Sequence, residues 1–135
     1  MAAAANVIGD RWTLLILREA LYGVTRFDAM QAELGVPRTV LSGRLKKLLA
    51  EGVLKQRPYR KAGERIRYQY VLTPKGVELA LPMIALMEWG DKYCRGGAST
   101  ADVVERNTGA ACHVGLVSDA GAPVSIGAAQ FRVKG

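Results

Sequence analysis

The hydrophobic residues in the first half of the chain follow the 3.6-residue period of an α-helix. An alanine-rich helix is expected before Gly9, and a second helix, capped by Asp10, is expected from Trp12 to about Tyr22. This second helix is apolar almost all round, which predicts burial on several sides by the core or by a partner subunit. Gly23 is expected to end it, because glycine tolerates the positive φ of a helix C-terminus.

The next helix is expected to begin at a capping box. The stretch Thr25-Arg26-Phe27-Asp28 has the form in which a hydroxyl and an acidic side chain satisfy the free N–H groups at a helix start. The residues that follow place Phe27, Met30 and Leu34 on one face. The pattern stops at Gly35, so this helix is short.

A longer helix is expected from about Arg38 to Glu51, after a tight connection at Val36-Pro37. Its leucines form a single stripe, made of Leu41, Leu45, Leu48 and Leu49. Two short helices joined by about three residues that include a glycine are typical of a helix-turn-helix. With the leucine stripe facing inward, the opposite side presents Thr39, Ser42, Gly43 and Lys46, and Arg38 projects from the first turn.

From Val53 onward the hydrophobic period changes from 3.6 to 2. Residues 53–57 read as one strand, and a second strand over 66–72 alternates Ile66, Tyr68, Tyr70 and Leu72 with more polar positions. The residues between the strands are polar, basic and rich in turn formers. A basic hairpin directly after a helix-turn-helix is typical of a wing, here at about residues 58–66.

The last regular element before the tail is a helix that Thr73-Pro74 is expected to start and that runs to about Tyr93, with Pro82 kinking or splitting it. We therefore assign residues 1–95 to a winged-helix domain and 96–135 to a C-terminal tail with a linker-like start. Within the tail, a small hairpin is expected to turn near 119–121. The predicted fold class is mainly α with a small antiparallel β-hairpin, an α+β winged helix-turn-helix.

Positive charge is concentrated in one part of the sequence. The whole chain of 135 residues has a formal net charge of +7. Residues 38–67 hold ten Lys and Arg against two Glu, a net charge of +8, so the rest of the chain is nearly neutral. An ordinary surface mixes both signs, and this concentration therefore predicts a polyanionic partner.

The helix from Arg38 and the hairpin after it supply the candidate contacts with double-stranded DNA. A recognition helix presents its N-terminal residues to base edges, and an arginine can form a bidentate pair with guanine. Basic residues farther along suit phosphates, and Lys55 is one of these. Tyr59, Tyr68 and Tyr70 are expected to pack the sheet against the helices. The predicted DNA-binding residues are Arg38, Thr39, Ser42, Arg44, Lys46, Arg57, Arg60, Lys61, Arg65 and Arg67.

The sequence offers little to an enzyme or to a metal. His113 is the only histidine, and the two cysteines, Cys94 and Cys112, have no zinc-ligand spacing, so we expect free thiols and no cofactor or metal. Recognisable carboxylate pairs and phosphate loops are missing, which argues against catalysis. No apolar run approaches the length of a membrane span and no secretory signal is recognisable, so we expect a cytoplasmic protein. A redox-sensing role for a thiol, or a small-molecule effector, stays open.

Several stretches resemble the HxlR-type winged-helix transcriptional regulators. They are Val7–Arg18 (VIGDRWTLLILR), Arg26-Phe27-Asp28, Arg38–Leu48 (RTVLSGRLKKL), Gly52-Val53-Leu54, Tyr68–Gly76 (YQYVLTPKG) and Glu88-Trp89-Gly90, which together cover about residues 5–93. The resemblance implies a homodimer that binds operator DNA, with the recognition helix in the major groove and the wing on the backbone or minor groove. Many members carry a cysteine before the first stretch, whereas this sequence has none before Cys94, so that redox switch is not predicted.

The resemblance also implies that the first and last helices build the dimer interface. Large apolar side chains in these helices agree with it, because so small a monomer hides them with difficulty. The predicted interface residues are Val7, Trp12, Leu15, Leu79, Met83, Leu86, Met87, Trp89 and Gly90. The alternative function is a winged-helix module for RNA or protein interaction, although the exposed aromatic platform or glycine-rich clamp of RNA modules is not recognisable.

Overall fold

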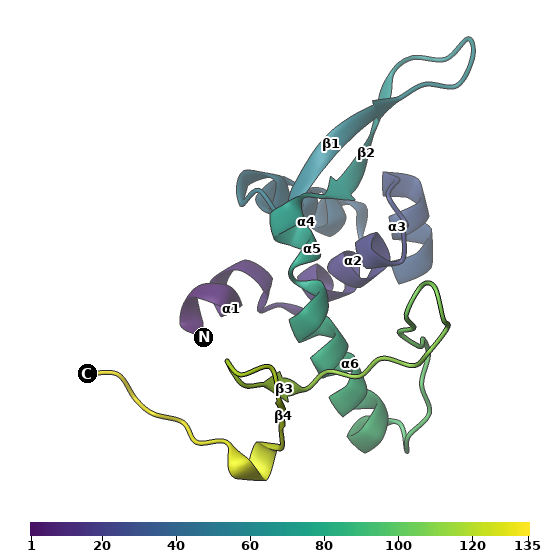
Figure 1. The fold of residues 1–135 in the computed structure, drawn as a ribbon. Coiled ribbons are helices and arrows are strands. Elements are labelled where there is room, and N and C mark those ends of the chain that lie inside the picture. Colours follow the sequence, from purple (N-terminus) through teal and green to yellow (C-terminus); the bar gives the residue numbers. More distant parts are fainter. The chain divides into compact units, whose positions relative to one another are not determined.

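The computed structural model describes all 135 residues and confirms a mainly helical fold with a small antiparallel hairpin (Figure 1). It has two compact units, residues 1–83 and 84–135, and the last long helix contributes to both. The elements are α1 (Ala2–Ile8), α2 (Arg11–Leu21), α3 (Phe27–Leu34), α4 (Arg38–Ala50), β1 (Leu54–Tyr59), β2 (Arg67–Leu72), α5 (Pro74–Val77), α6 (Ala80–Cys94), β3 (Leu116–Val117), β4 (Pro123–Val124) and the 3-10 turn η1 (Ile126–Ala128).

The core of the first unit forms where α2 and the leucine stripe of α4 meet. Ile16 and Leu17 of α2 are fully buried, and the three buried leucines of α4 are Leu41, Leu45 and Leu48. Helix α2 packs against α3, α4 and β2, as its nearly continuous apolar surface predicted. Burial of each such side chain contributes about 1.5–3 kcal/mol of hydrophobic free energy, so this core fixes how α4 is presented.

Two predicted helix ends are confirmed in detail. Asp10 is the N-cap of α2, and its carboxylate accepts a hydrogen bond from the backbone N–H of Thr13 at 3.1 Å. Gly35 ends α3 with a left-handed φ of 61°, which a residue with a Cβ adopts only with strain. The connection between α3 and α4 is consequently short, and the two helices form the expected helix-turn-helix.

The capping box predicted at Thr25 is wrong. The N-cap of α3 is Arg26, and no side chain caps that helix. Thr25 instead belongs to a short extended segment beside β2: its carbonyl oxygen accepts a hydrogen bond from the Tyr70 N–H at 2.7 Å, and an isolated bridge joins Arg26 to Gln69. Pairing with a strand distant in sequence therefore prevails over the local capping pattern.

The hairpin is antiparallel and runs from the pair Leu54–Leu72 to the pair Tyr59–Arg67. Strand β1 therefore continues two residues beyond the predicted Arg57 and includes Pro58. Proline lacks an N–H group and is tolerated on an edge strand. Strand β1 is such an edge, because β2 has β1 on one side and the bridge to Arg26 on the other.

The predicted split of the last helix occurs upstream of the proline. Helix α5 ends at Val77 and α6 begins at Ala80, so Pro82 is the third residue of α6. Proline lacks the N–H that a helix interior requires, but this loss costs nothing within the first turn. The position of Pro82 therefore indicates a helix start and not a kink within one helix.

In the second unit, the C-terminal tail contacts the last turns of α6. The Val114 N–H donates to Glu88 Oε1 at 3.1 Å, and His113 Nδ1 lies 3.5 Å from the same oxygen. The predicted tail hairpin is confirmed as β3 and β4, with Gly121 at φ 80° in its turn. Cys94 and Cys112 are free and exposed. No helix in the structure is both long enough and apolar enough to cross a membrane.

Candidate nucleic-acid interface

The polar side of α4 is open to solvent, as the leucine stripe predicted. Arg38, Thr39, Ser42 and Lys46 are all exposed. On the opposite side Leu41, Leu45 and Leu48 are buried in the core, and Leu49 is half-buried against it. The N-cap residue of α4 is Pro37, so no side chain caps the helix, and its first turn holds no acidic residue. Its first N–H groups and the positive end of its dipole are therefore available to an anion.

A groove lies between α3, α4 and the hairpin, with a volume of about 680 Å³. It brings together residues that the sequence predicted separately, namely Arg38 and Ser42 from α4 and Arg65 and Arg67 from the hairpin. We call this hollow the helix–wing groove. Its lining is Phe27, Asp28, Arg38, Ser42, Gln56, Tyr59, Arg65, Ile66, Arg67, Tyr68 and Tyr70.

The turn between the strands, residues 60–66, is exposed throughout and projects from the helices of the first unit (Figure 1). It carries Arg60, Lys61 and Arg65, and Gly63 supplies its positive φ of 78°. Arg60 and Lys61 do not line the groove and lie farther out on the wing. The basic residues of the wing therefore extend the charged surface beyond the groove.

Two arginines at the groove are stacked on aromatic rings. The Arg38 guanidinium carbon lies 4.9 Å from the centroid of Phe27, and that of Arg26 lies 4.3 Å from the centroid of Tyr59. Such cation–π contacts are worth about 0.5–1 kcal/mol at exposed sites. Arg26 was not among the predicted DNA-binding residues, because only the pairing of its segment with β2 brings it to Tyr59.

The tyrosines of the hairpin divide between packing and exposure. Tyr70 packs against the core and Tyr59 is half-buried, in agreement with the expected packing role. Tyr68 differs, since 52% of its surface is exposed, and it lines the helix–wing groove. Tyr68 is therefore placed to contact a ligand in the groove as well as to support the sheet.

Arg57, Gln69 and Thr25 form a chain of hydrogen bonds at the base of the wing. With its amide nitrogen donating to Thr25 Oγ1 at 2.7 Å, Gln69 accepts from Arg57 Nε and Nη2 at 3.0 and 3.1 Å through its amide oxygen. This orientation satisfies every partner of the amide. Arg57, a predicted DNA contact, is thereby held by the opposite strand.

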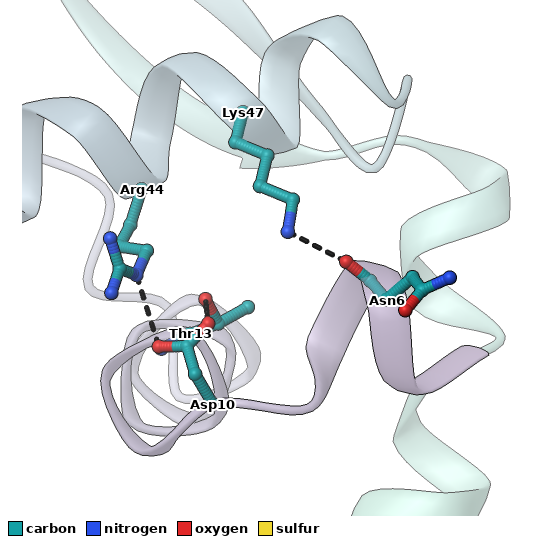
Figure 2. Close-up of polar contacts among 5 residues, drawn as sticks. All are labelled: Asn6, Asp10, Thr13, Arg44 and Lys47. Carbon is teal, nitrogen blue, oxygen red and sulfur yellow. Dashed lines mark hydrogen bonds and ion pairs between the residues drawn. The ribbon is translucent and has the colours of Figure 1, made fainter. Parts of the chain in front are cut away.

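Arg44 and Lys47 are not among the residues that line the groove, and their side chains point toward the start of the chain (Figure 2). Arg44 Nε donates to Asp10 Oδ1 at 3.0 Å, and Lys47 Nζ donates to the carbonyl oxygen of Asn6 at 2.6 Å. Arg44 was predicted among the DNA contacts. Because its guanidinium is paired with the carboxylate of Asp10, the N-cap residue of α2, we do not keep it among the proposed contacts.

Asp10 holds several partners at once. Partial burial alone would raise the pKa of its carboxyl, but hydrogen bonds from the Thr13 hydroxyl, from Arg44 and from the Thr13 N–H, together with the Arg44 charge, lower it to about 2. The Thr13 hydroxyl donates to Asp10 Oδ2 at 2.6 Å. Asp10 is therefore ionised at every pH at which the protein is expected to work.

The predicted dimer residues fall into two groups. Leu86 and Trp89 of α6 are 53% and 60% exposed, and the Trp89 ring lies 5.6 Å from that of Tyr93. Val7, Trp12 and Leu79 are half-buried against the core, and Leu15, Met87 and Gly90 are also half-buried. Met83 is only 5% exposed and belongs to the core of its own chain. A second copy cannot reach it, so we leave Met83 out of the proposed interface.

The fold and the groove define a winged helix-turn-helix domain, and comparison with known proteins gives its family. A family model described as HxlR-like helix-turn-helix matches residues 7–97, so the chain belongs to the HxlR-like helix-turn-helix family.

Two curated relatives are named as HTH-type transcriptional regulators. Rv3095 of Mycobacterium tuberculosis is 46% identical over 90 residues, which are 67% of this chain and 56% of that protein. YvaP of Bacillus subtilis is 35% identical over 91 residues, covering 67% of this chain and 82% of that protein. The chain therefore spans little more than half the length of the mycobacterial relative. These are names of regulators and not of enzymes, as the sequence led us to expect.

A solved structure is similar over almost the whole chain. The crystal structure of PA1607, named as a candidate transcription factor, has a TM-score of 0.79 and 31% sequence identity, and the match covers 96% of this chain and 91% of that one. The similarity therefore includes the C-terminal tail as well as the winged helix.

Proposed function

We propose that the chain is a transcriptional regulator that binds operator DNA as a homodimer, with α4 in the major groove. One observation carries this proposal: the helix–wing groove joins Arg38 and Ser42 of α4 to Arg65 and Arg67 of the hairpin. A major groove about 12 Å wide admits a helix, and a neighbouring basic turn then reaches the phosphate backbone or the minor groove. Membership of the HxlR-like family supports the same function.

The exposed residues divide into two roles in this proposal. Arg38, Thr39 and Ser42 at the start of α4 contact base edges, and Arg38 is the residue suited to a bidentate pair with guanine. The remaining basic residues contact phosphates and set affinity more than sequence preference. These proposed phosphate contacts are Lys46, Arg57, Arg60, Lys61, Arg65 and Arg67. Because DNA is the partner, we propose the cytoplasm as the place of action.

Dimerisation is proposed through α1 and α6. None of the seven residues of α1 is buried, and an isolated helix of that length is unstable in water. Leu81, Leu86, Trp89 and Tyr93 on α6 are all more than half exposed. A second copy that covers both helices gives α1 a packing surface and removes these apolar side chains from water.

Selection of bound duplexes from a random pool tests the proposal. We expect one preferred sequence with two related half-sites about 10 base pairs apart, or a multiple of that spacing. Structured RNA of the same length should compete weakly. Equal retention of all duplexes, or preferential retention of the RNA, would contradict the proposal and favour the RNA or protein interaction module.

A further inference from the structure

Two basic residues of α4, Arg44 and Lys47, make hydrogen bonds to other parts of the same chain. Arg44 and Lys47 are one turn apart, on a different flank of the helix from Arg38 and Ser42, because 3.6 residues make one turn. Their partners are Asp10, the N-cap residue of α2, and the carbonyl oxygen of Asn6 in the last turn of α1 (Figure 2). We call these two contacts the α4 anchor.

The Asp10 side of the anchor is rigid. Both carboxylate oxygens are used: Oδ1 accepts from the Thr13 N–H at 3.1 Å and from Arg44 Nε at 3.0 Å, and Oδ2 accepts from the Thr13 hydroxyl at 2.6 Å. Thr13 itself is 1% exposed, so it cannot turn away without breaking core packing. Asp10 therefore holds the Arg44 guanidinium at a fixed place relative to α2.

The buried face of α4 does not by itself restrain rotation of the helix about its axis. Leu41, Leu45 and Leu48 pack on apolar neighbours, and hydrophobic contacts are not directional, so they resist separation better than a small rotation about the helix axis. Reading a base edge requires hydrogen-bond geometry, which tolerates a few tenths of an ångström. The hydrogen bonds of Arg44 and Lys47 are directional, so they restrain the rotation of α4 that the leucine stripe leaves free.

We propose that Arg44 and Lys47 are positioning residues, which fix the rotation of α4 through Asp10 and Asn6 and do not contact DNA. This inference rests on the proposed function. It also assigns a role to the end of α1 and the residue that caps α2: a displacement of α1 reaches α4 through Asn6 and Asp10. Whatever packs on α1, a second copy included, thereby influences how α4 meets DNA.

The test compares three variants of the full chain. Asp10→Ser keeps a good N-cap for α2 but is too short to reach Arg44. Arg44→Met keeps most of the side-chain stem without the charge. The double variant, Asp10→Ser with Arg44→Met, has the same net charge as the unchanged protein, so its electrostatic attraction to any duplex is matched. Lys47→Met probes the second contact, and thermal unfolding followed by circular dichroism confirms that each variant is folded.

The readouts are the affinity ratio between the preferred and an unrelated duplex, and the slope of log affinity against log salt. A positioning role predicts that the charge-matched double variant keeps the slope and the affinity for the unrelated duplex. It also predicts that the affinity ratio of the double variant falls by roughly 3- to 10-fold. This fall should be no larger than that of either single variant, because the two residues act as one unit. Lys47→Met should lower the ratio by a smaller factor.

A DNA-contacting Arg44 gives the opposite result. The double variant then weakens both duplexes equally, its slope falls by about 0.9 per site, and its ratio is unchanged. That result, or an unchanged ratio and slope, overturns the positioning role while the proposed function stands. If the unchanged protein itself prefers no duplex, the proposed function fails, and the positioning role fails with it.

Discussion

The Arg38 guanidinium is stacked on the Phe27 ring, with 4.9 Å between its central carbon and the ring centroid. Phe27 is the first residue of α3 and Arg38 the first of α4, so the stack joins the two helices of the helix-turn-helix at their N-termini. A long side chain that is already ordered loses less conformational entropy when it binds. The stack therefore prepares Arg38 for the base contact proposed for it.

Replacing Arg38 should affect one base pair of each half-site. Arg38→Ala is expected to cost about 1–3 kcal/mol of discrimination at that base pair and to leave the preference at other positions unchanged. Phe27→Leu, which keeps an apolar side chain but removes the ring, should weaken the preference at the same base pair by a smaller factor. Selection profiles measure both effects, with Arg106→Ala in the second unit as the control for charge alone. A profile unaltered by Arg38→Ala would exclude the base contact.

Lys61, in the exposed turn of the wing, is expected to contact a phosphate. Lys61→Ala should weaken binding to every duplex by a similar factor and reduce the slope of log affinity against log salt by about 0.9 per site, because one fewer counterion is released. Titrations at several salt concentrations measure it. Lys134→Ala removes the same charge from the C-terminal tail and should leave the slope as it is. Equal slopes for the two variants would rule out the wing contact.

Features of this fold that depend on neighbouring residues could be predicted from the sequence, whereas contacts between distant residues could not. The leucine stripe of α4, the cap at Asp10 and the turn at Gly35 were all predicted, because each depends on residues within one or two turns. The sequence predicted the basic start of α4 and the basic hairpin that line the groove. It did not predict the groove itself, because the shape of the groove depends on how these segments pack together. Neither the pairing of Thr25 with Gln69 nor that of Arg44 with Asp10 has a local signal, because their partners are 44 and 34 residues away.

Those distant partners account for the correction at Thr25 and for leaving Arg44 out of the proposed contacts. A threonine followed three residues later by an acid matches a capping box, and nothing nearby shows that Thr25 instead pairs with a strand. An arginine on a basic helix matches a phosphate contact in the same way. Composition gives the net charge of a segment, whereas only the tertiary structure shows which of its charges are already paired.

The low pKa of Asp10 gives the protein a pH-dependent contribution to stability. The pKa is about 2 in the folded protein and 3.8 for a free side chain, so folding favours the ionised form. The contribution is complete above a pH of about 4 and is lost as the pH falls through about 2. The side chain is 39% exposed, so solvent screening limits its size to about 1 kcal/mol.

Asp10→Asn isolates this contribution, because asparagine is also a good N-cap but carries no charge. Urea unfolding should show the variant less stable by about 1 kcal/mol at about pH 6, with the difference shrinking as the pH falls from about 4 to about 2. Asp119→Asn, at an exposed position in the tail, serves as the control and should change stability little. A difference for Asp10→Asn that does not vary with pH would mean that the lost charge is not its cause.

The proposed dimer interface is tested best where α6 is exposed. Leu86 is 53% exposed, so Leu86→Glu should disturb the single chain little, whereas burial of its carboxylate against a second copy carries a desolvation cost of several kcal/mol. We expect monomers in sedimentation experiments, and the same from Met87→Glu. Two linked half-sites bind far more tightly than one, so tight operator binding should disappear with the dimer. Val117→Glu, at a position 68% exposed in β3, is the matched control. If Leu86→Glu sediments as a dimer and Val117→Glu as a monomer, the interface lies on the tail and not on α6.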